Sequence, residues 1–266
     1  MVNVIVAAAL AAAMPPSTPA AAPPAAPAMF VVHDADTTIY IFGTFHALDA
    51  QAQWFTSPVQ HAFEQSNELV LETVIPERPQ ALQATPGFHG PSVTPSASFL
   101  ATTRMAISAG QSQGMQVGNG ADMVLKHLAE AEGKQIEGLE TLQLQLDMFN
   151  RMPADPAMPA RLPRDRQPVG ENQMDSLSKA MADMQAAWKR GDQSVFVRML
   201  DQLKTASPET YRMMFTERNE RWADWIRARM QTPGTVFVAV GAGHLAGHDS
   251  LLVRLAERGL PSQRVN

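Results

Sequence analysis

Short runs of β-branched, aliphatic and aromatic residues predict the strands of this chain. Phe30–Val32 and Thr37–Phe42 are two such runs, and the turn residues Asp34-Ala35-Asp36 between them predict a hairpin. The other segments predicted to be strands are Glu68–Leu71, Lys134–Leu139, Thr235–Val240 and a short one near Arg264–Val265. Thr235–Val240 is the strongest strand pattern in the chain.

Apolar residues at three- and four-residue spacing predict helices between these strands. Ser57 and Pro58 suit the cap and the first turn of one helix, at about Pro58–Ser66. The other segments with helical periodicity are Ser98–Gln111, Asp122–Glu132, Thr141–Asn150, Glu171–Arg190, Asp192–Lys204, Pro208–Met230 and Asp249–Arg258. The Met, Leu, Phe and Trp residues of Glu171–Arg190, Asp192–Lys204 and Pro208–Met230 are expected to form helix cores. Two proline-rich stretches, Pro76–Pro95 and Met152–Pro168, are predicted to be loops.

The order of these elements predicts an α/β fold with a mixed central sheet. A strand, a Gly-x-x-His turn, a helix and a strand follow one another near the N-terminus and again near the C-terminus. These two modules are expected to form the sheet together. A largely helical middle insert separates them along the chain.

The residues that follow the predicted strands could carry chemistry. Two strands lead into Gly-x-x-His motifs, at Gly43–His46 and Gly241–His244, and two others end at carboxylates, Glu72 and Glu140. Ligands of open α/β sheets bind at the carboxyl ends of the strands. If these four strands lie in one sheet with the same orientation, two imidazoles and two carboxylates therefore meet at one edge.

Two neutral imidazoles and one carboxylate can hold a divalent metal ion and leave positions open for water or substrate. Such an ion lowers the pKa of a bound water and polarises a carbonyl group. The second carboxylate could then serve as general base or orient a ligand histidine. We expect His46 and His244 to face one cavity within roughly 8 Å of each other. Glu72 is expected to point into that cavity, with Glu140 at a neighbouring strand end.

Structural roles are the competing interpretation of each residue. A single histidine at a strand end is more often structural than functional, although two in matched contexts favour a shared site. Glu72 could be a buried carboxylate satisfied by backbone donors. Glu140 could be favoured simply because a helix start welcomes a negative charge.

Composition narrows the classes of function. The 266 residues are 45% apolar and 18% charged, which is typical of a globular protein. The net charge is −5 and the pI about 5.8, so the chain lacks the clustered basic residues of a nucleic-acid-binding protein. There is no cysteine, which excludes disulfides, thiolate nucleophiles and sulfur-ligated zinc. A metal site must therefore use His, Asp or Glu.

Residues 1–29 resemble a signal peptide followed by an Ala/Pro-rich disordered segment. Val2–Ala13 is an apolar run too short to span a bilayer, and Met14–Met29 consists mostly of Ala and Pro. No Lys or Arg precedes the apolar run, which is unusual for a signal peptide. We expect a secreted or periplasmic protein, with no transmembrane helix further along the chain. The alternative is a disordered tail, and in either case residues before Phe30 are expected to pack against nothing.

Several motifs together resemble the TraB/GumN family, which is related to the TIKI metalloproteases. The matching segments are IFGTFHALD, ELVLET, GNGADMVLKHLAEAEGKQIEGLET, AAWKRGD, ERNERWADWI and VFVAVGAGHLAG, which span about residues 37 to 265. The resemblance implies one TraB/GumN-like domain at residues 30–266. It also implies a metal-dependent proteolytic or hydrolytic fold, with His46, His244 and Glu72 as the metal ligands.

The same resemblance draws attention to an Arg-Asn-x-x-Trp element at Arg218, Asn219 and Trp222. Arg218 could steady a carboxylate or an oxyanion, and Asn219 could donate to substrate. The structural alternative is a helix that packs on the sheet through a buried Trp222.

Two functions follow from these observations. The first is a hydrolase, most plausibly a peptidase, that depends on a divalent ion (Mn, Co, Zn or Fe) and acts on a peptide or protein. The second is a non-catalytic binder outside the cytoplasm that uses the same histidines for a peptide, haem or metal.

Overall fold

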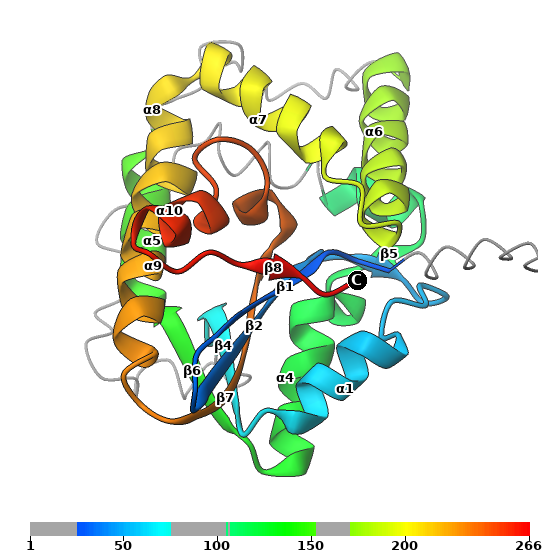
Figure 1. Cartoon of the computed structure of the whole chain (residues 1–266). Coiled ribbons are helices and arrows are strands. Elements are labelled where there is room, and N and C mark those ends of the chain that lie inside the picture. Colours follow the sequence, from blue (N-terminus) through cyan, green and yellow to red (C-terminus); the bar gives the residue numbers. More distant parts are fainter. Residues whose placement is uncertain (1–25, 76–104, 106, 153–170) are drawn as a thin grey trace, which may run out of the picture.

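The structure, a computed structural model, describes residues 26–75, 105, 107–152 and 171–266 (Figure 1). These residues form a mixed α/β fold, as predicted. Its main sheet has the order β6-β4-β7-β2-β1-β8, and a small second sheet pairs β3 with β5. The strands are β1 (Met29–His33), β2 (Thr37–Thr44), β3 (Leu48–Asp49), β4 (Glu68–Thr73), β5 (Met115–Gln116), β6 (Gln135–Glu140), β7 (Gly234–Gly241) and β8 (Gln263–Arg264).

The four strands that carry the predicted site run in the same direction. β2 and β4 pair in parallel with β7 on either side of it, and β6 pairs in parallel with β4. Thr44 lies opposite Gly241, Leu71 opposite Ala239 and Thr73 opposite Glu140. The carboxyl ends of all four strands therefore meet at one edge of the sheet. β1 is antiparallel to β2, which confirms the predicted hairpin.

Helices cover both faces of the sheet and its carboxyl edge (Figure 1). They are α1 (Ser57–Gln65), α4 (Ala121–Glu132), α5 (Leu142–Arg151), α6 (Glu171–Lys189), α7 (Ser194–Ala206), α8 (Pro208–Tyr211), α9 (Glu217–Arg229) and α10 (Leu251–Glu257). Of the helix predicted at Ser98–Gln111, only the end is described, and residues 107–112 are helical. No helix in the described ranges is long and apolar enough to cross a membrane.

Alternation along the strands sends side chains to two cores. On β7, Phe237 and Ala239 pack in the core beneath α1 and α4, whereas Val236, Val238 and Val240 pack against α9 and α10. The interior of the first core is aromatic: the Phe42 ring centroid lies 5.7 Å from that of Trp54 and 5.8 Å from that of Phe237.

The middle insert is fixed to the sheet beside the first Gly-x-x-His turn. Trp188, near the end of α6, is 2% exposed, and its indole N–H donates to the Gly43 carbonyl at 2.7 Å. A buried Trp finds such a partner because an unpaired donor in the core is destabilising. The insert helices are thereby held next to the carboxyl edge of the sheet.

Some residues that precede Phe30 are packed against the rest of the fold. Ala26 and Ala28 are buried, and Met29 is fully buried as the first residue of β1. The Gly43 N–H donates to the Ala28 carbonyl at 3.1 Å, and the Asn266 side chain donates to the Pro27 carbonyl at 2.7 Å. The expectation that residues before Phe30 pack against nothing is therefore wrong for 26–29. This segment leads into β1 and lies beside β2, while the rest of the predicted 1–29 segment lies outside the described residues.

Candidate functional site

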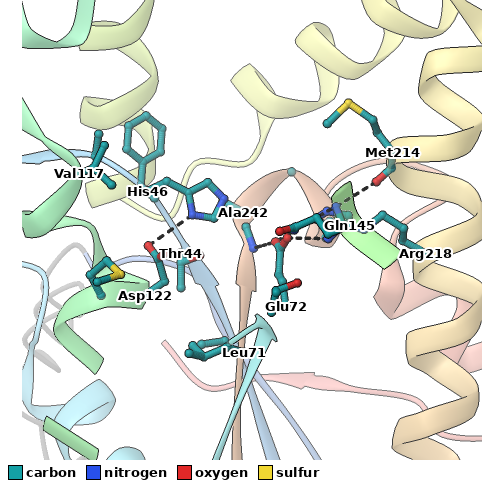
Figure 2. A pocket seen from close by; sticks show the side chains of 18 of the residues that line it. Thr44, His46, Leu71, Glu72, Val117, Asp122, Gln145, Met214, Arg218 and Ala242 are labelled. Atoms are coloured by element: carbon teal, nitrogen blue, oxygen red, sulfur yellow. Dashed lines mark hydrogen bonds and ion pairs between the residues drawn. The ribbon is translucent and has the colours of Figure 1, made fainter. Parts of the chain in front are cut away.

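A cavity of about 610 Å³ opens at the carboxyl edge of the sheet. His46 follows β2, Glu72 lies near the end of β4, and His244 lies in a short 3₁₀ turn, η3 (Ala242–Leu245), after β7. All three line the cavity, together with Arg218 from α9 (Figure 2). Glu140 ends the neighbouring strand β6, as expected, but it does not line the cavity.

Gly241 lies at the centre of this group. A Cβ atom on it would lie 3.1 Å from Glu72 Oε1, 3.3 Å from His46 Nε2 and 3.8 Å from a carbon of the His244 ring. Both imidazoles thus lie close to one point, and the expected proximity within roughly 8 Å is confirmed. The glycine is needed because a side chain here would occupy the space between the three groups.

His244 is held in one tautomer. Its Nδ1 lies 2.7 Å from Asn219 Oδ1, while Asn219 Nδ2 donates to the Asp249 carbonyl at 2.7 Å. Because that second bond requires an N–H donor, the amide oxygen must face the ring, and an oxygen can only accept. Nδ1 of His244 therefore carries the proton and Nε2 carries the lone pair. Burial, helped by the positive charges of Arg218 and His46, lowers the pKa of His244 to about 3.

His46 has the opposite electrostatic surroundings. Burial within the cavity walls favours the neutral ring, but Asp122 and the negative charge of Glu72 outweigh it and raise the pKa of His46 to about 9. The Nδ1 atom lies 3.3 Å from Asp122 Oδ1 (Figure 2). The side chain keeps 61% of its surface open, because it projects into the cavity. Its Nε2 faces Gly241, away from Asp122.

Asp122 was not among the predicted site residues. It lies in the first turn of α4, whose start approaches His46 closely: the Ala121 N–H donates to the Phe45 carbonyl at 3.0 Å. A Cβ on Gly120 would collide with the His46 carbonyl oxygen, so only glycine permits this approach. The signal in the sequence was the Gly-Ala-Asp start of a helix, which by itself predicts only an N-terminal charge.

Glu72 is an ionised carboxylate with both oxygens engaged. Oε1 accepts from the Gly241 N–H at 2.7 Å, and Oε2 accepts from Arg218 Nη2 at 2.7 Å. Burial alone would raise the pKa of Glu72, but the two imidazoles, the Arg218 guanidinium and the Gly241 amide hold it well below its usual range. Oε1 lies 3.8 Å from His244 Nε2.

Arg218 connects these groups from beneath the cavity. It is 3% exposed, and its Nε donates to both oxygens of Glu140, at 3.1 and 2.9 Å. Its Nη1 lies 3.3 Å from His244 Nε2, and the guanidinium stacks 4.5 Å from the Trp222 ring centroid. One buried guanidinium therefore holds Glu72 and Glu140 in place and contacts His244 as well.

The roles of Glu140 and Asn219 look different in the structure from those expected of them. The Glu140 side chain is 1% exposed and pairs with Arg218 and with Arg221, the latter at 3.0 Å. This arrangement favours orientation of Arg218 over general-base action. The amide of Asn219 is engaged at both ends, which favours positioning of His244 over donation to a substrate.

A π turn shapes the wall of the cavity. The predicted helix at Pro208–Met230 is interrupted at Arg212–Thr216, where the Glu217 N–H donates to the Arg212 carbonyl. Single π turns of this kind occur frequently at functional sites. Met214 and Phe215 in this turn line the cavity, and the Phe215 ring centroid lies 4.9 Å from that of His244. Helical periodicity predicted the helix but not the extra residue in this turn.

The imidazole nitrogens and the carboxylate oxygen of this site are atom types that bind divalent metal ions. His46 and His244 each have Nδ1 facing a side-chain oxygen, which is how proteins orient metal-ligating histidines. Nε2 of His46 lies near Gly241, and Nε2 of His244 lies 3.8 Å from Glu72 Oε1. Glu72 adds an ionised oxygen. In the described part of the chain, no three His, Asp or Glu side chains are grouped at metal-binding distances. Binding of an ion would therefore require these atoms to approach one another.

Comparison with known proteins assigns the chain to a family. The model of the TraB/PrgY/gumN family matches residues 28–89 and 90–264. The chain belongs to this family. All of the residues that form the polar part of the cavity lie within the matched ranges. No curated protein and no solved structure matches the chain.

Proposed function

We propose that this member of the TraB/PrgY/gumN family is a divalent-metal-dependent hydrolase, with peptides as its substrates. His46, His244 and Glu72 would hold the ion, which would be Mn, Co, Zn or Fe. One observation carries the proposal: two imidazoles, each with Nδ1 facing a side-chain oxygen, lie against Gly241 beside an ionised carboxylate. A structural pair of histidines has no need of this shared orientation.

The bound ion would supply Lewis acidity, lowering the pKa of a water and polarising a carbonyl. The chain provides the rest of the chemistry. Asn219 accepts from His244 Nδ1 and so leaves the lone pair of this ring on Nε2. Asp122 pairs with Nδ1 of the protonated His46 ring, so that Nε2 is the atom that would lose its proton when an ion binds. Arg218 places a fixed positive charge at the floor, where it can stabilise negative charge that develops on a substrate oxygen. Glu140 keeps Arg218 in this position.

The second function that the sequence allowed, a non-catalytic binder of a peptide, haem or metal, uses the same site. Arg218 Nη1, 3.3 Å from His244 Nε2, favours the peptide and haem forms of this binder, because a guanidinium there competes with a cation and suits an anionic group. The two functions differ in turnover, so an activity measurement separates them.

We also propose that the protein acts outside the cytoplasm, as a secreted or periplasmic protein. This rests on the signal-peptide-like residues 1–29 alone. Fusion of this segment to a reporter that is active only after export tests it. An inactive reporter would count against export.

Hydrolysis of a mixed peptide library, with each of the four metals supplied in turn, tests the proposed function. The full-length chain should cleave peptides with at least one of the metals and stop when a chelator is added. The single variants His46→Ala and His244→Ala should be inactive to a similar degree, because groups that act as one unit do not contribute additively. Peptide binding without any cleavage would favour the binder, and a double histidine variant with full metal-dependent activity would refute the site.

A further inference from the structure

The cavity has two walls of different chemistry. The carboxyl edge of the sheet, α4 and α9 provide the polar groups, whereas α6, α7 and the π turn provide an apolar wall. The residues of this apolar wall are Met181, Met184, Phe196, Met199, Met214 and Phe215, from α6, α7 and the π turn.

The methionines of this apolar wall are not core residues, although helical periodicity predicted cores. All four of them are half-buried and line the cavity instead. Apolar surface left open in a cavity of about 610 Å³ is what a ligand-binding pocket provides. Methionine has three rotatable bonds and a polarisable sulfur, so such a wall adapts to side chains of different shape.

The apolar wall begins directly beside the polar groups. Phe215 packs its ring against His244 and approaches Gly243, where a Cβ would lie 3.2 Å from the Phe215 ring. The Met214 carbonyl accepts from Arg218 Nη1 at 3.4 Å, which ties this wall to the floor of the site (Figure 2). A carbonyl group placed over the histidines and Arg218 would therefore put the neighbouring side chain against the wall.

We propose that the cavity selects peptides with a large aliphatic or aromatic side chain next to the bond that is cleaved. This inference rests on the proposed hydrolase function for the cleavage but not for the binding. Transfer of such a side chain from water to an apolar wall strengthens binding by roughly 10-fold to 100-fold. A small polar side chain gains nothing there and leaves the apolar surface uncovered.

Binding of two blocked amino acids to the full-length protein tests the selection. N-acetyl-leucine N-methylamide and N-acetyl-serine N-methylamide differ only in the side chain, and each is titrated against a fluorescent apolar dye held in the cavity. The concentration of the leucine compound that displaces half of the dye should be lower than that of the serine compound by roughly 10-fold or more. The ratio of kcat/KM for two peptides that differ in the same way should favour leucine to a similar extent.

A pair of adjacent variants assigns the effect to the apolar wall. Met214→Gln puts a polar group of similar size into the wall and should remove most of the preference for leucine. Met213→Gln is the control, because Met213 is the preceding residue and does not line the cavity. Met199→Gln provides a second wall variant if Met214→Gln fails to fold, which circular dichroism would show.

Equal binding of the leucine and serine compounds would overturn the proposal. So would an equal loss of leucine binding in Met213→Gln and Met214→Gln. If the preference is found and depends on Met214, but no peptide is cleaved with any metal, then the proposed function fails while the apolar wall keeps its assigned role.

Discussion

His46 and His244 share a cavity, but their surroundings stabilise opposite charge states. His244 is buried beside Arg218, and its pKa falls to about 3, so it is neutral at neutral pH. His46 is paired with Asp122, and its pKa rises to about 9, so it is protonated at neutral pH. Binding of a metal ion at His46 must therefore displace a proton. The pKa values differ because burial and the charge of Arg218 disfavour a positive charge on His244, whereas Asp122 and Glu72 favour one on His46.

The pKa of His46 should depend on Asp122. In Asp122→Asn the pairing charge is gone, and the pKa of His46 should fall from about 9 towards the ordinary 6.5, as measured by NMR titration of the ring protons in metal-free protein. Asp224→Asn, which removes the same charge from an exposed position on α9, is the control and should leave the pKa of His46 unchanged.

The same titration has a consequence for stability. Because the folded pKa is raised, protonated His46 stabilises the folded state below about pH 6.5, and this contribution is lost as the pH rises through about 9. In Asp122→Asn, the free energy of unfolding should not show this fall between about pH 6.5 and about pH 9. A His46 pKa that stays near 9 in Asp122→Asn would show that another group holds the proton.

At the scale of elements, the parallel strands made much of the site predictable. The side chain after each strand can be read from the chain, and four carboxyl ends in one sheet bring His46, Glu72 and His244 together. Asp122 could not be predicted, because its contact depends on how closely α4 approaches the backbone of His46. Periodicity also missed the π turn, because one extra residue in a turn leaves the apolar spacing on both sides intact. The buried segment at 26–29 was missed because Ala and Pro carry little apolar signal.

Arg218 on α9 should be important for stability as well as for chemistry. Arg218→Ala leaves Glu72 buried without its cation and Glu140 with Arg221 alone, and the free energy of unfolding should fall by about 3–5 kcal/mol. Urea unfolding measures the change.

A double variant shows that the loss comes from the uncompensated carboxylate. The double variant that combines Arg218→Ala with Glu140→Gln should lose less free energy of unfolding than the two single variants lose together. The reason is that the neutral glutamine no longer needs the cation. Additive losses would mean that Arg218 stabilises the fold through its packing on Trp222 instead of through its charge.

At the scale of the whole molecule, the carboxyl edge of the sheet supplies His46, Glu72 and His244, whereas α6, α7 and the π turn supply the apolar wall. The insert is held in place by α6, whose Trp188 binds the Gly43 carbonyl beside the first Gly-x-x-His turn. In the proposed function, the groups that hold the ion and the surface that receives the substrate side chain therefore come from different elements, which meet where Phe215 packs on His244.

Two truncations should separate the N-terminal segment from the fold. Removal of residues 1–25 should leave the melting temperature nearly unchanged, because Ala/Pro-rich sequence offers little apolar surface to offset ordering. Removal of residues 1–29 should lower it by several degrees, because the fully buried Met29 and the backbone pairing of Ala28 are lost. Thermal unfolding followed by circular dichroism measures both. Equal melting temperatures for the two truncated chains would mean that residues 26–29 contribute nothing to the core.

The metal content of the purified protein tests the central claim most directly. Full-length protein is incubated with Mn, Co, Zn or Fe at a pH near 9, freed of excess ion, and measured by elemental analysis. We expect about one ion per chain for at least one metal, and almost none in His46→Ala, His244→Ala or Glu72→Gln. Asp224→Asn should bind as much as the unaltered chain. An unaltered chain that retains none of the four metals, or a double histidine variant that retains its ion, would contradict the assignment of these residues as a metal site.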